Sequence, residues 1–456
     1  MKRLIGDQNF YRKIMMIAFP IIVQNGITNF VGMLDNIMVG QVGTIQMSAV
    51  SISNQLIFVY NLCIFGALSG AGIFTAQYFG NRDKEGIQYS FRYKWMISLV
   101  VTILGLCIFL LFGNALIGFY LNGEGNIKDT LFYGKQYLNI MMVGIPFFMV
   151  SQIYSDTLRE TSNSVVPMKS GLIAVAVNLV GNYILIYGKF GLPALGSAGA
   201  AFATVLSRFV EMVCNVSWTH RHREECFFMD GMYKTFKIPF SLLKTYFITG
   251  FPLLLNETMW AAGLAMLTQC YSTRGLDVVA SLNISNTITN VSGTVFIAMG
   301  ISVGILVGQL LGAQQIEQAR DTVVKSCAFS IFVCFGIMIV MFFVAPIFPK
   351  IYNTKPEIQS LSTKIILLST LFMPLQSYIN CVYFVMRAGG KTFVTFLFDS
   401  AYVWAISVPA AFIISRYTTL PVQMIYLVVQ LLDIIKVIVG SILIKKGIWI
   451  QTLLRE

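Results

Sequence analysis

The sequence predicts an all-α integral membrane protein with twelve transmembrane helices in two pseudo-symmetric six-helix bundles. Three observations lead to this fold class: an apolar composition, twelve apolar runs of membrane-spanning length, and a repeat between the two halves of the chain. Of the 456 residues, 56% are hydrophobic and 11% are charged, whereas soluble domains carry roughly 25% charged residues. So much apolar surface requires lipid, so the bilayer is the first expected partner.

Each apolar run is long enough for one helix, because a helix needs roughly 20 apolar residues to cross the hydrocarbon. The first run follows MKRLIGDQNFYRK without a cleavage site of small residues, so we expect a retained first helix. The predicted spans are 14–39, 49–78, 95–117, 131–157, 167–188, 194–217, 245–270, 278–309, 325–347, 361–386, 393–415 and 420–444. Little chain is left for a separate soluble domain.

The positive charges fit a membrane topology better than a nucleic-acid interface. The formal charge is +12, but Lys and Arg lie between apolar runs and do not cluster with aromatic residues. With both termini in the cytoplasm, 22 of the 32 Lys and Arg residues fall in inner loops, including Arg92 and Lys94, and eight fall in outer loops. The positive-inside rule therefore predicts an even number of spans and two cytoplasmic termini. We expect the protein in the cytoplasmic (inner) membrane, without a nucleic-acid partner.

A basic loop separates the two halves. We expect an N-terminal six-helix lobe at 1–217, a cytoplasmic linker loop at 218–244 and a C-terminal six-helix lobe at 245–456. The linker holds the only two histidines, His220 and His222, which we expect to be solvated. The eight cysteines lie mostly in apolar segments without a CxxC motif, so we expect reduced, packed thiols and no metal site. A span region without histidine disfavours an integral membrane enzyme; we expect neither enzymatic activity nor a cofactor.

The two halves repeat at nearly constant offsets. An offset of 232 aligns GIFTAQYFG with GILVGQLLG, and an offset of 228 applies further along the chain. The aligned pairs are Pro20 with Pro252, Gln77 with Gln309, Gly80 with Gly312, Pro146 with Pro374, and Arg159 with Arg387. Gly80 and Gly312 are expected to end helices, Arg159 and Arg387 to anchor the topology, and Gly70, Gly300 and Gly304 to allow close packing. Two similar halves in the same orientation place substrate sites at their interface.

Several stretches resemble the multidrug and toxic compound extrusion (MATE) family. AFPIIVQNGITNFVGMLDNIMVGQVG is similar to the first helix of these exporters, and GFPLLLNETMWAAG to their seventh. The most specific similarity is NLVGNYILIYGKFGLPALGSAGAAFATVLSR, at 178–208, and RAGGKT at Arg387 matches the loop after the tenth helix. The resemblance covers nearly the whole chain and is to the NorM-like bacterial branch, in the MOP superfamily. It implies two six-helix lobes, a cleft that opens alternately to either side, and export driven by inward Na⁺ or H⁺.

One expected site lies in the N-terminal lobe, since an ionisable side chain in the bilayer core marks an ion path by default. Asp35 lies late in the first span, Asn178 and Asn182 share one face of the fifth, and Thr204 lies in the sixth. Their oxygens suit Na⁺ or a carboxyl that takes up a proton. NorM-like relatives are similar at these four positions, which form a cation site. Alternatively, Asp35 bonds to Asn36 near the outer interface. Because other branches carry a second carboxylate where this chain has Asn182, the coupling ion stays open between Na⁺ and H⁺.

A second expected site is a substrate cavity in the C-terminal lobe, lined by Asn256, Glu257, Trp260, Gln376 and Asp399. Glu257 follows the helix-bending Pro252 and either faces the cavity or bonds to the backbone that the proline frees. NorM-like relatives have a tenth-helix carboxylate where this chain has Gln376. A second cation site is therefore doubtful, and we expect Glu257 to attract a cationic substrate or to titrate with protons.

Two further charged groups lie in the last spans. Asp399 precedes Tyr402 and either recognises an organic cation together with this ring or has a structural role. Asp433 and Lys436, three residues apart, are expected to pair on one helix face.

The sequence thus predicts a monomeric, secondary-active antiporter for small organic molecules, and we expect these to be cationic. The nearest rival is a flippase of related fold for lipid-linked oligosaccharides. Such a protein needs cationic residues along its cleft to hold pyrophosphate, and the predicted N-terminal spans offer none well inside the membrane.

Overall fold

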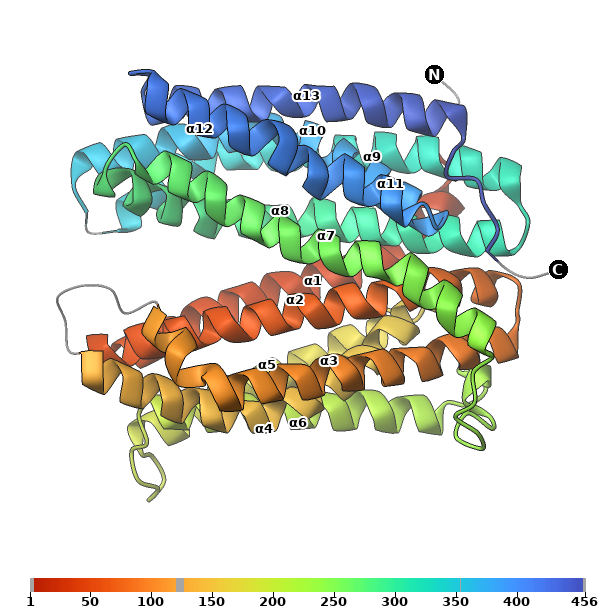
Figure 1. The fold of residues 1–456 in the computed structure, drawn as a ribbon, viewed down its shortest axis with the longest axis horizontal. Coiled ribbons are helices and arrows are strands. Elements are labelled where there is room, and N and C mark those ends of the chain that lie inside the picture. Colours follow the sequence, from red (N-terminus) through yellow and green to blue (C-terminus); the bar gives the residue numbers. More distant parts are fainter. Residues whose placement is uncertain (1–3, 120–126, 353, 454–456) are drawn as a thin grey trace. The chain divides into compact units, whose positions relative to one another are not determined.

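The computed structural model describes residues 4–119, 127–352 and 354–453, and this part of the chain is almost entirely helical, without a strand (Figure 1). The α-helices are α1 Gln8–Gly40, α2 Thr44–Gly80, α3 Lys84–Phe119, α4 Ile127–Glu160, α5 Val165–Tyr187, α6 Ser197–Arg221, α7 Phe240–Ser272, α8 Leu276–Gly312, α9 Ile316–Val344, α10 Pro356–Ala388, α11 Thr392–Phe396, α12 Val408–Tyr417 and α13 Val422–Lys446. The short helices are η1 Phe227–Met229, η2 Phe348–Ile351, η3 Leu397–Ala401 and η4 Val403–Ser407.

The helices confirm the predicted fold class. Within the described residues, 11 segments are long and apolar enough to cross a membrane, with α11 to α12 forming one continuous span at Thr392–Tyr417. The remaining predicted span, 245–270, is α7, which has 33 residues but carries the polar pair Asn256 and Glu257 near its middle. The chain is a multi-pass membrane protein.

Helix α3 begins well before the predicted span at 95–117, so the placement of Arg92 and Lys94 in a loop is wrong. Both side chains lie inside α3 and are buried. Each has a partner that makes burial tolerable: Arg92 Nε donates to the Met232 carbonyl oxygen at 3.1 Å, and Lys94 forms an ion pair with Glu160. The apolar pattern alone could not show this, because it stops at the first charged residues.

The predicted linker, 218–244, is partly ordered against α3. Gln88 Nε2 donates to the carbonyl oxygens of Phe228 and Asp230, both at 2.9 Å, and the Phe228 side chain is buried. His220 lies in the last turn of α6, where its Nε2 is 3.0 Å from the Tyr154 hydroxyl. His220 is therefore partly buried against Tyr154, whereas His222 is exposed.

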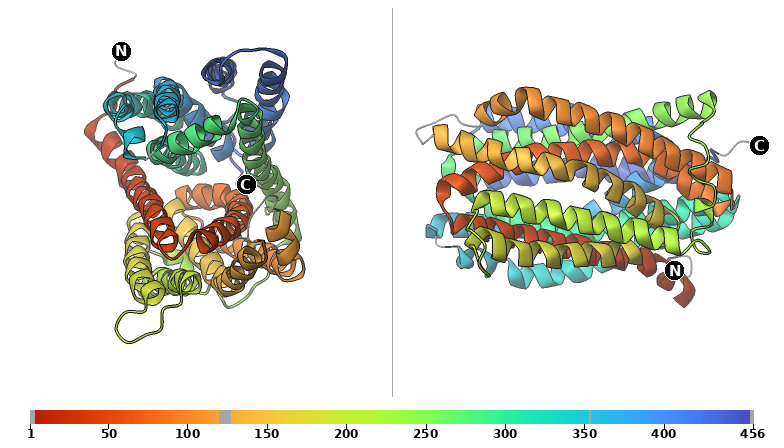
Figure 2. Two further views of the ribbon diagram at one scale, coloured as in Figure 1. Left: turned by 90° about the vertical axis from the view of Figure 1, so that its left-hand side faces the viewer. Right: turned by 90° about the horizontal axis from the view of Figure 1, so that it is seen from below.

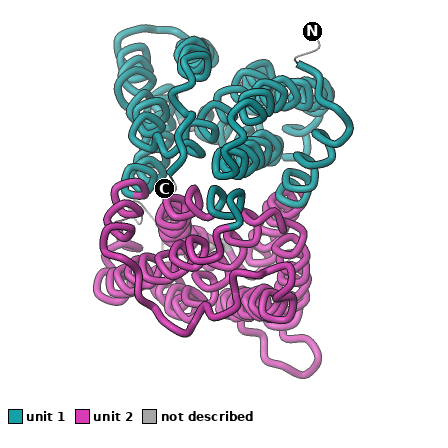
Figure 3. The backbone as a smooth tube through the Cα atoms, turned by 90° about the vertical axis from the view of Figure 1, so that its right-hand side faces the viewer, with its two compact units in different colours: residues 1–22, 76–82, 251–456 teal, residues 23–75, 83–250 magenta. Residues whose placement is uncertain are grey.

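The chain forms two compact units, coloured separately in Figure 3. Unit 1 contains residues 1–22, 76–82 and 251–456, and unit 2 contains 23–75 and 83–250. The chain crosses between them inside α1, two residues after Pro20, and inside α7, just before the repeat-equivalent Pro252. A proline inside a helix removes a backbone hydrogen bond, so each crossing lies at a weak point of its helix. The predicted lobe boundaries at 217 and 245 remain a prediction.

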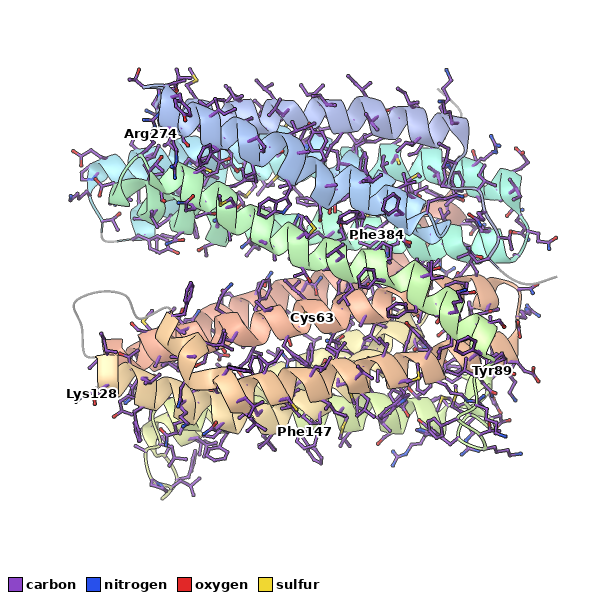
Figure 4. All side chains as sticks on the ribbon, viewed as in Figure 1. Cys63, Tyr89, Lys128, Phe147, Arg274 and Phe384 are labelled. Carbon is purple, nitrogen blue, oxygen red and sulfur yellow. The ribbon has the colours of Figure 1, made fainter. Side chains whose placement is uncertain are left out.

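In unit 1, α10 packs against α8, α9 and α13, and Figure 2 shows these helices nearly end-on. Gly300 and Gly304 of α8 face Phe384 of α10, which is labelled in Figure 4, and a Cβ on Gly300 would overlap its ring. This confirms the predicted close packing at these glycines. Large apolar side chains such as Phe332 and Phe343 of α9 are more than 70% exposed, as expected for a surface that faces lipid.

Repeat-equivalent residues meet in unit 1. Helices α2 and α8 end at Gly80 and Gly312, as predicted. A Cβ on Gly80 would overlap the backbone of Gln309, and a Cβ on Gly312 would overlap the backbone of Gln77. The two contacts exchange under the offset of 232, so the sequence repeat is also a structural one.

Candidate functional site

The four residues of the predicted N-terminal cation site lie together in unit 2. Asp35 comes from α1, Asn178 and Asn182 from one face of α5, and Thr204 from α6. Asn182 Nδ2 donates to Asp35 Oδ1 at 2.5 Å, and both asparagine side chains are buried. Asp35 lies five residues before the end of α1 at Gly40, and Asn182 five before the end of α5 at Tyr187. The cluster therefore lies near the ends of its helices.

The amide groups of Asn178 and Asn182 face the Asp35 carboxylate, and one amide oxygen is left without a hydrogen-bond donor. With the Asn178 amide turned so that its nitrogen faces Asp35, Nδ2 lies 3.0 and 3.1 Å from the two carboxylate oxygens, and Oδ1 accepts from Thr204 Oγ1 at 3.2 Å. Asn182 Oδ1 is buried and has no hydrogen-bond donor in the described part of the chain. A buried acceptor without a donor costs free energy, which a bound cation would recover.

No lysine or arginine in the described ranges forms an ion pair with Asp35. Arg208, one turn beyond Thr204 on α6, pairs instead with Glu211 of its own helix at 2.9 Å. The cluster thus holds one carboxylate without an ion pair against two amide groups and a hydroxyl. These side chains carry the oxygens that a hard cation prefers, and the carboxylate can also take up an exchangeable proton.

The predicted cavity residues of unit 1 divide into a connected group and separate members. Asn256 Nδ2 donates to Asp399 Oδ2 at 3.1 Å and to the Tyr383 hydroxyl at 3.2 Å. That hydroxyl donates to Glu257 Oε1 at 3.1 Å. The two carboxylates are therefore linked through one amide and one phenol. None of these contacts joins Glu257 to the backbone that Pro252 frees, which was the alternative prediction.

Gln376 and Trp260 lie outside this network. Gln376 Nε2 donates to Asp433 Oδ2 at 2.7 Å, while Trp260 is partly buried on α7 one turn beyond Asn256. Lys436 Nζ lies 3.4 Å from Asp399 Oδ1 on another helix. The predicted pairing of Asp433 with Lys436 is therefore wrong, because each of the two finds a partner on a neighbouring helix.

A change of helix type positions Asp399. The eleventh span passes through two π-helical segments, η3 and η4, between α11 and α12, and Asp399 and Ser400 lie in η3. Ser400 Oγ donates to the Asn256 backbone carbonyl at 2.7 Å, and Ser400 N donates to the Asn256 side chain at 3.3 Å. π-helical turns are rare and occur often at functional sites, and here two of them accompany the half-buried Asp399 carboxylate.

Sequence reasoning missed two polar features. Tyr383, which joins Glu257 to Asn256, lies in an apolar stretch of α10 and gave no signal as a single tyrosine. Lys94 forms its ion pair with Glu160 of α4, and its Nζ also donates to Thr157 Oγ1 at 3.0 Å. The signal for Lys94 was its place directly before the apolar run at 95–117, which α3 extends back to Lys84.

Comparison with known proteins decides the family. The MatE family matches this chain over residues 20–184 and 252–413. The chain belongs to the MatE family. Both matched segments begin at a repeat-equivalent proline, Pro20 and Pro252, and together they span most of the two halves.

This MatE chain has curated relatives named as multidrug resistance proteins. It is 24% identical to the probable multidrug resistance protein NorM of Thermotoga maritima, covering 89% of this chain and 86% of the relative. It is 23% identical to the multidrug resistance protein MdtK of Yersinia pseudotuberculosis, covering 88% and 87%.

Solved structures show the same fold. One is described as the outward-facing conformation of a multidrug resistance MATE family transporter of the MOP superfamily, with a TM-score of 0.82 at 18% identity and 98% coverage of both chains. Another, a MOP superfamily transporter from Pyrococcus furiosus, has a TM-score of 0.85 at 18% identity, with 98% and 97% coverage.

Proposed function

We propose that this MatE protein is a cation-coupled antiporter, driven by Na⁺ or H⁺, that exports organic cations across the cytoplasmic membrane by alternating access. The observation that carries the proposal is the arrangement around Asp35: a carboxylate held by two asparagines, without an ion pair in the described chain, beside the unpartnered Asn182 Oδ1. A charge in an apolar span is expensive unless it has a partner or a transport role.

The coupling ion would bind or protonate Asp35 and change the balance between two conformations. An ion shifts this balance only if its affinity differs between outward-open and inward-open states. Pro20 lies where α1 passes from unit 1 to unit 2, so a bend there would move Asp35 relative to the part of α1 in unit 1. Glu257 supplies negative charge for the attraction of a cationic substrate, whereas Asp399 is paired with Lys436.

Asp35→Asn tests this proposal directly. In inside-out vesicles, we expect the wild-type chain to export a cationic dye at a rate that falls when one of two gradients, Na⁺ or H⁺, is collapsed. Asp35→Asn should reduce ion-driven export to the level of vesicles without the protein, at equal expression and melting temperature. Asp277→Asn, which changes an exposed carboxylate in the first turn of α8, is the matched control. An unchanged export rate in Asp35→Asn would refute the proposal.

The flippase alternative gains no support from the buried cations of unit 2. Lys94 is bonded to Glu160 and Thr157, and Arg92 to backbone carbonyls, so neither presents its charge to an anionic headgroup.

A further inference from the structure

Lys436 is a buried ammonium group in an apolar helix. It lies near the middle of α13, and its side chain is only 7% exposed. Nζ is 3.4 Å from Asp399 Oδ1 and 5.0 Å from the centre of the Tyr402 ring. The ammonium thus has a carboxylate on one side and an aromatic face on another, which is how proteins hold a small or organic cation.

Lys436 pairs with a carboxylate on another helix, although another carboxylate lies one turn away on its own helix. Asp433 lies one turn before Lys436 on the same helix but accepts from Gln376 at 2.7 Å. Lys436 instead reaches across to Asp399, whose other oxygen accepts from Asn256 at 3.1 Å. The ammonium therefore pairs with Asp399 of the Asp399–Asn256–Tyr383–Glu257 network, while its charge also acts on Asp433 of its own helix.

The network differs from the Asp35 cluster in its charge balance. Both place a carboxylate against an asparagine amide, but the Asp35 cluster holds no ion pair in the described ranges, and the Asp399 network contains a covalently attached cation. A buried carboxylate needs a compensating charge or proton. A tethered ammonium provides it permanently and does not exchange with solvent.

We propose that Lys436 occupies a cation site of unit 1 as a built-in counter-ion, so that Asp399 binds no mobile ion and each transport cycle uses the single ion site at Asp35. This inference rests on the proposed ion-coupled export. It has a specific consequence: removal of the ammonium opens a second site for Na⁺ or H⁺ at Asp399.

Ion dependence of transport tests the inference in proteoliposomes, with the driving ion varied at constant ionic strength. For wild type we expect an apparent Hill coefficient of about one, because the coefficient is limited by the number of coupled sites. Lys436→Met should raise it toward about two, whereas Lys436→Arg and the double variant Lys436→Met with Asp399→Asn should stay near one. If Lys436 has only a structural role, Lys436→Met lowers the transport rate but leaves the Hill coefficient near one.

A binding measurement covers the case in which Lys436→Met does not transport. In an Asp35→Asn background, Lys436→Met should give a melting temperature that rises by about 2 °C or more on addition of Na⁺ or on acidification. Addition of Asp399→Asn should remove that rise.

Two results overturn the inference: a wild-type coefficient near two, or Lys436→Met without any gain of ion dependence in both measurements. Wild-type transport that is independent of both gradients would instead refute the proposed function, so the two failures are distinguishable.

Discussion

At the scale of single residues, Asp35 and Glu257 are both carboxylates in apolar helices, yet their surroundings differ. Asp35 is bonded to amides near the end of α1, whereas Glu257 accepts from the Tyr383 hydroxyl near the middle of α7. The repeat places Leu267 at the position equivalent to Asp35. The two halves therefore differ in the residues that the proposed coupling would use, and we expect their carboxylates to have different tasks.

This division of tasks predicts different effects of two substitutions. Glu257→Gln removes a negative charge and should weaken apparent affinity for cationic drugs by roughly tenfold, equivalent to about 1.4 kcal/mol, with less effect on neutral drugs. Asn182→Ala removes the amide that donates to Asp35, together with its unpartnered oxygen, and should raise the half-saturating concentration of the driving ion. Efflux assays with a cationic and a neutral substrate measure both. Loss of transport for every substrate in Glu257→Gln, together with unchanged ion dependence in Asn182→Ala, would refute the division.

How far the sites could be predicted depends on the range of their contacts. Asn178 and Asn182 are four residues apart, and helical spacing alone places them on one face. Their approach to Asp35 came from the family resemblance, since no local rule joins α1 to α5. The partner of Lys436 was mispredicted because Asp433 lies within one turn, while Asp399 lies 37 residues away on another helix.

At the scale of helices, α3 shows why spans were easier to predict than their ends. Hydrophobic runs of about 20 residues mark the membrane segment, but a helix continues wherever its polar groups find partners. Lys94 and Glu160 extend α3 and α4 beyond the apolar runs, and Gly72 of α2 packs directly against the Glu160 carboxylate. The π-helical segments of the eleventh span had no sequence signal, and the hydrogen bond of Ser400 in η3 joins them to a residue of α7 far away in the chain.

The Lys94–Glu160 pair predicts a measurable asymmetry between single and double substitution. Lys94→Met removes the ammonium that pairs with the mostly buried Glu160 and should destabilise the protein by about 3–5 kcal/mol, whereas Lys94→Met with Glu160→Gln should recover most of this loss. Thermal unfolding in detergent gives the comparison. Lys325→Met, which breaks the more exposed pair with Asp321 on α9, is the control and should cost less than about 1 kcal/mol. If the stability losses of Lys94→Met and Glu160→Gln instead add up in the double variant, the two residues do not depend on each other.

At the scale of the whole molecule, the repeat connects sequence and structure. The offset of 232 predicted two related halves, and the exchanged contacts of Gly80 with Gln309 and Gly312 with Gln77 bear it out in unit 1. The repeat could not predict where the compact units divide. Those boundaries follow packing, and they fall inside α1 and α7 close to Pro20 and Pro252.

The orientation of the chain in the membrane is the property that the charge distribution predicts most directly. Both termini and the 218–244 loop should be cytoplasmic, because most Lys and Arg residues then lie inside. In a variant without native cysteines, Asp230→Cys should react with a membrane-impermeant maleimide only after the cells are permeabilised. Asp230 is 61% exposed, so access to the reagent depends on sidedness.

Burial raises the pKa of the native Cys226 thiol to about 12, so this nearby loop cysteine is a poor substitute reporter. Phe190→Cys, in the exposed connection between α5 and α6, should react in intact cells and is the matched control for the opposite side. Labelling of position 230 in intact cells, with position 190 protected, would reverse the topology and place the Asp35 end of α1 in the cytoplasm.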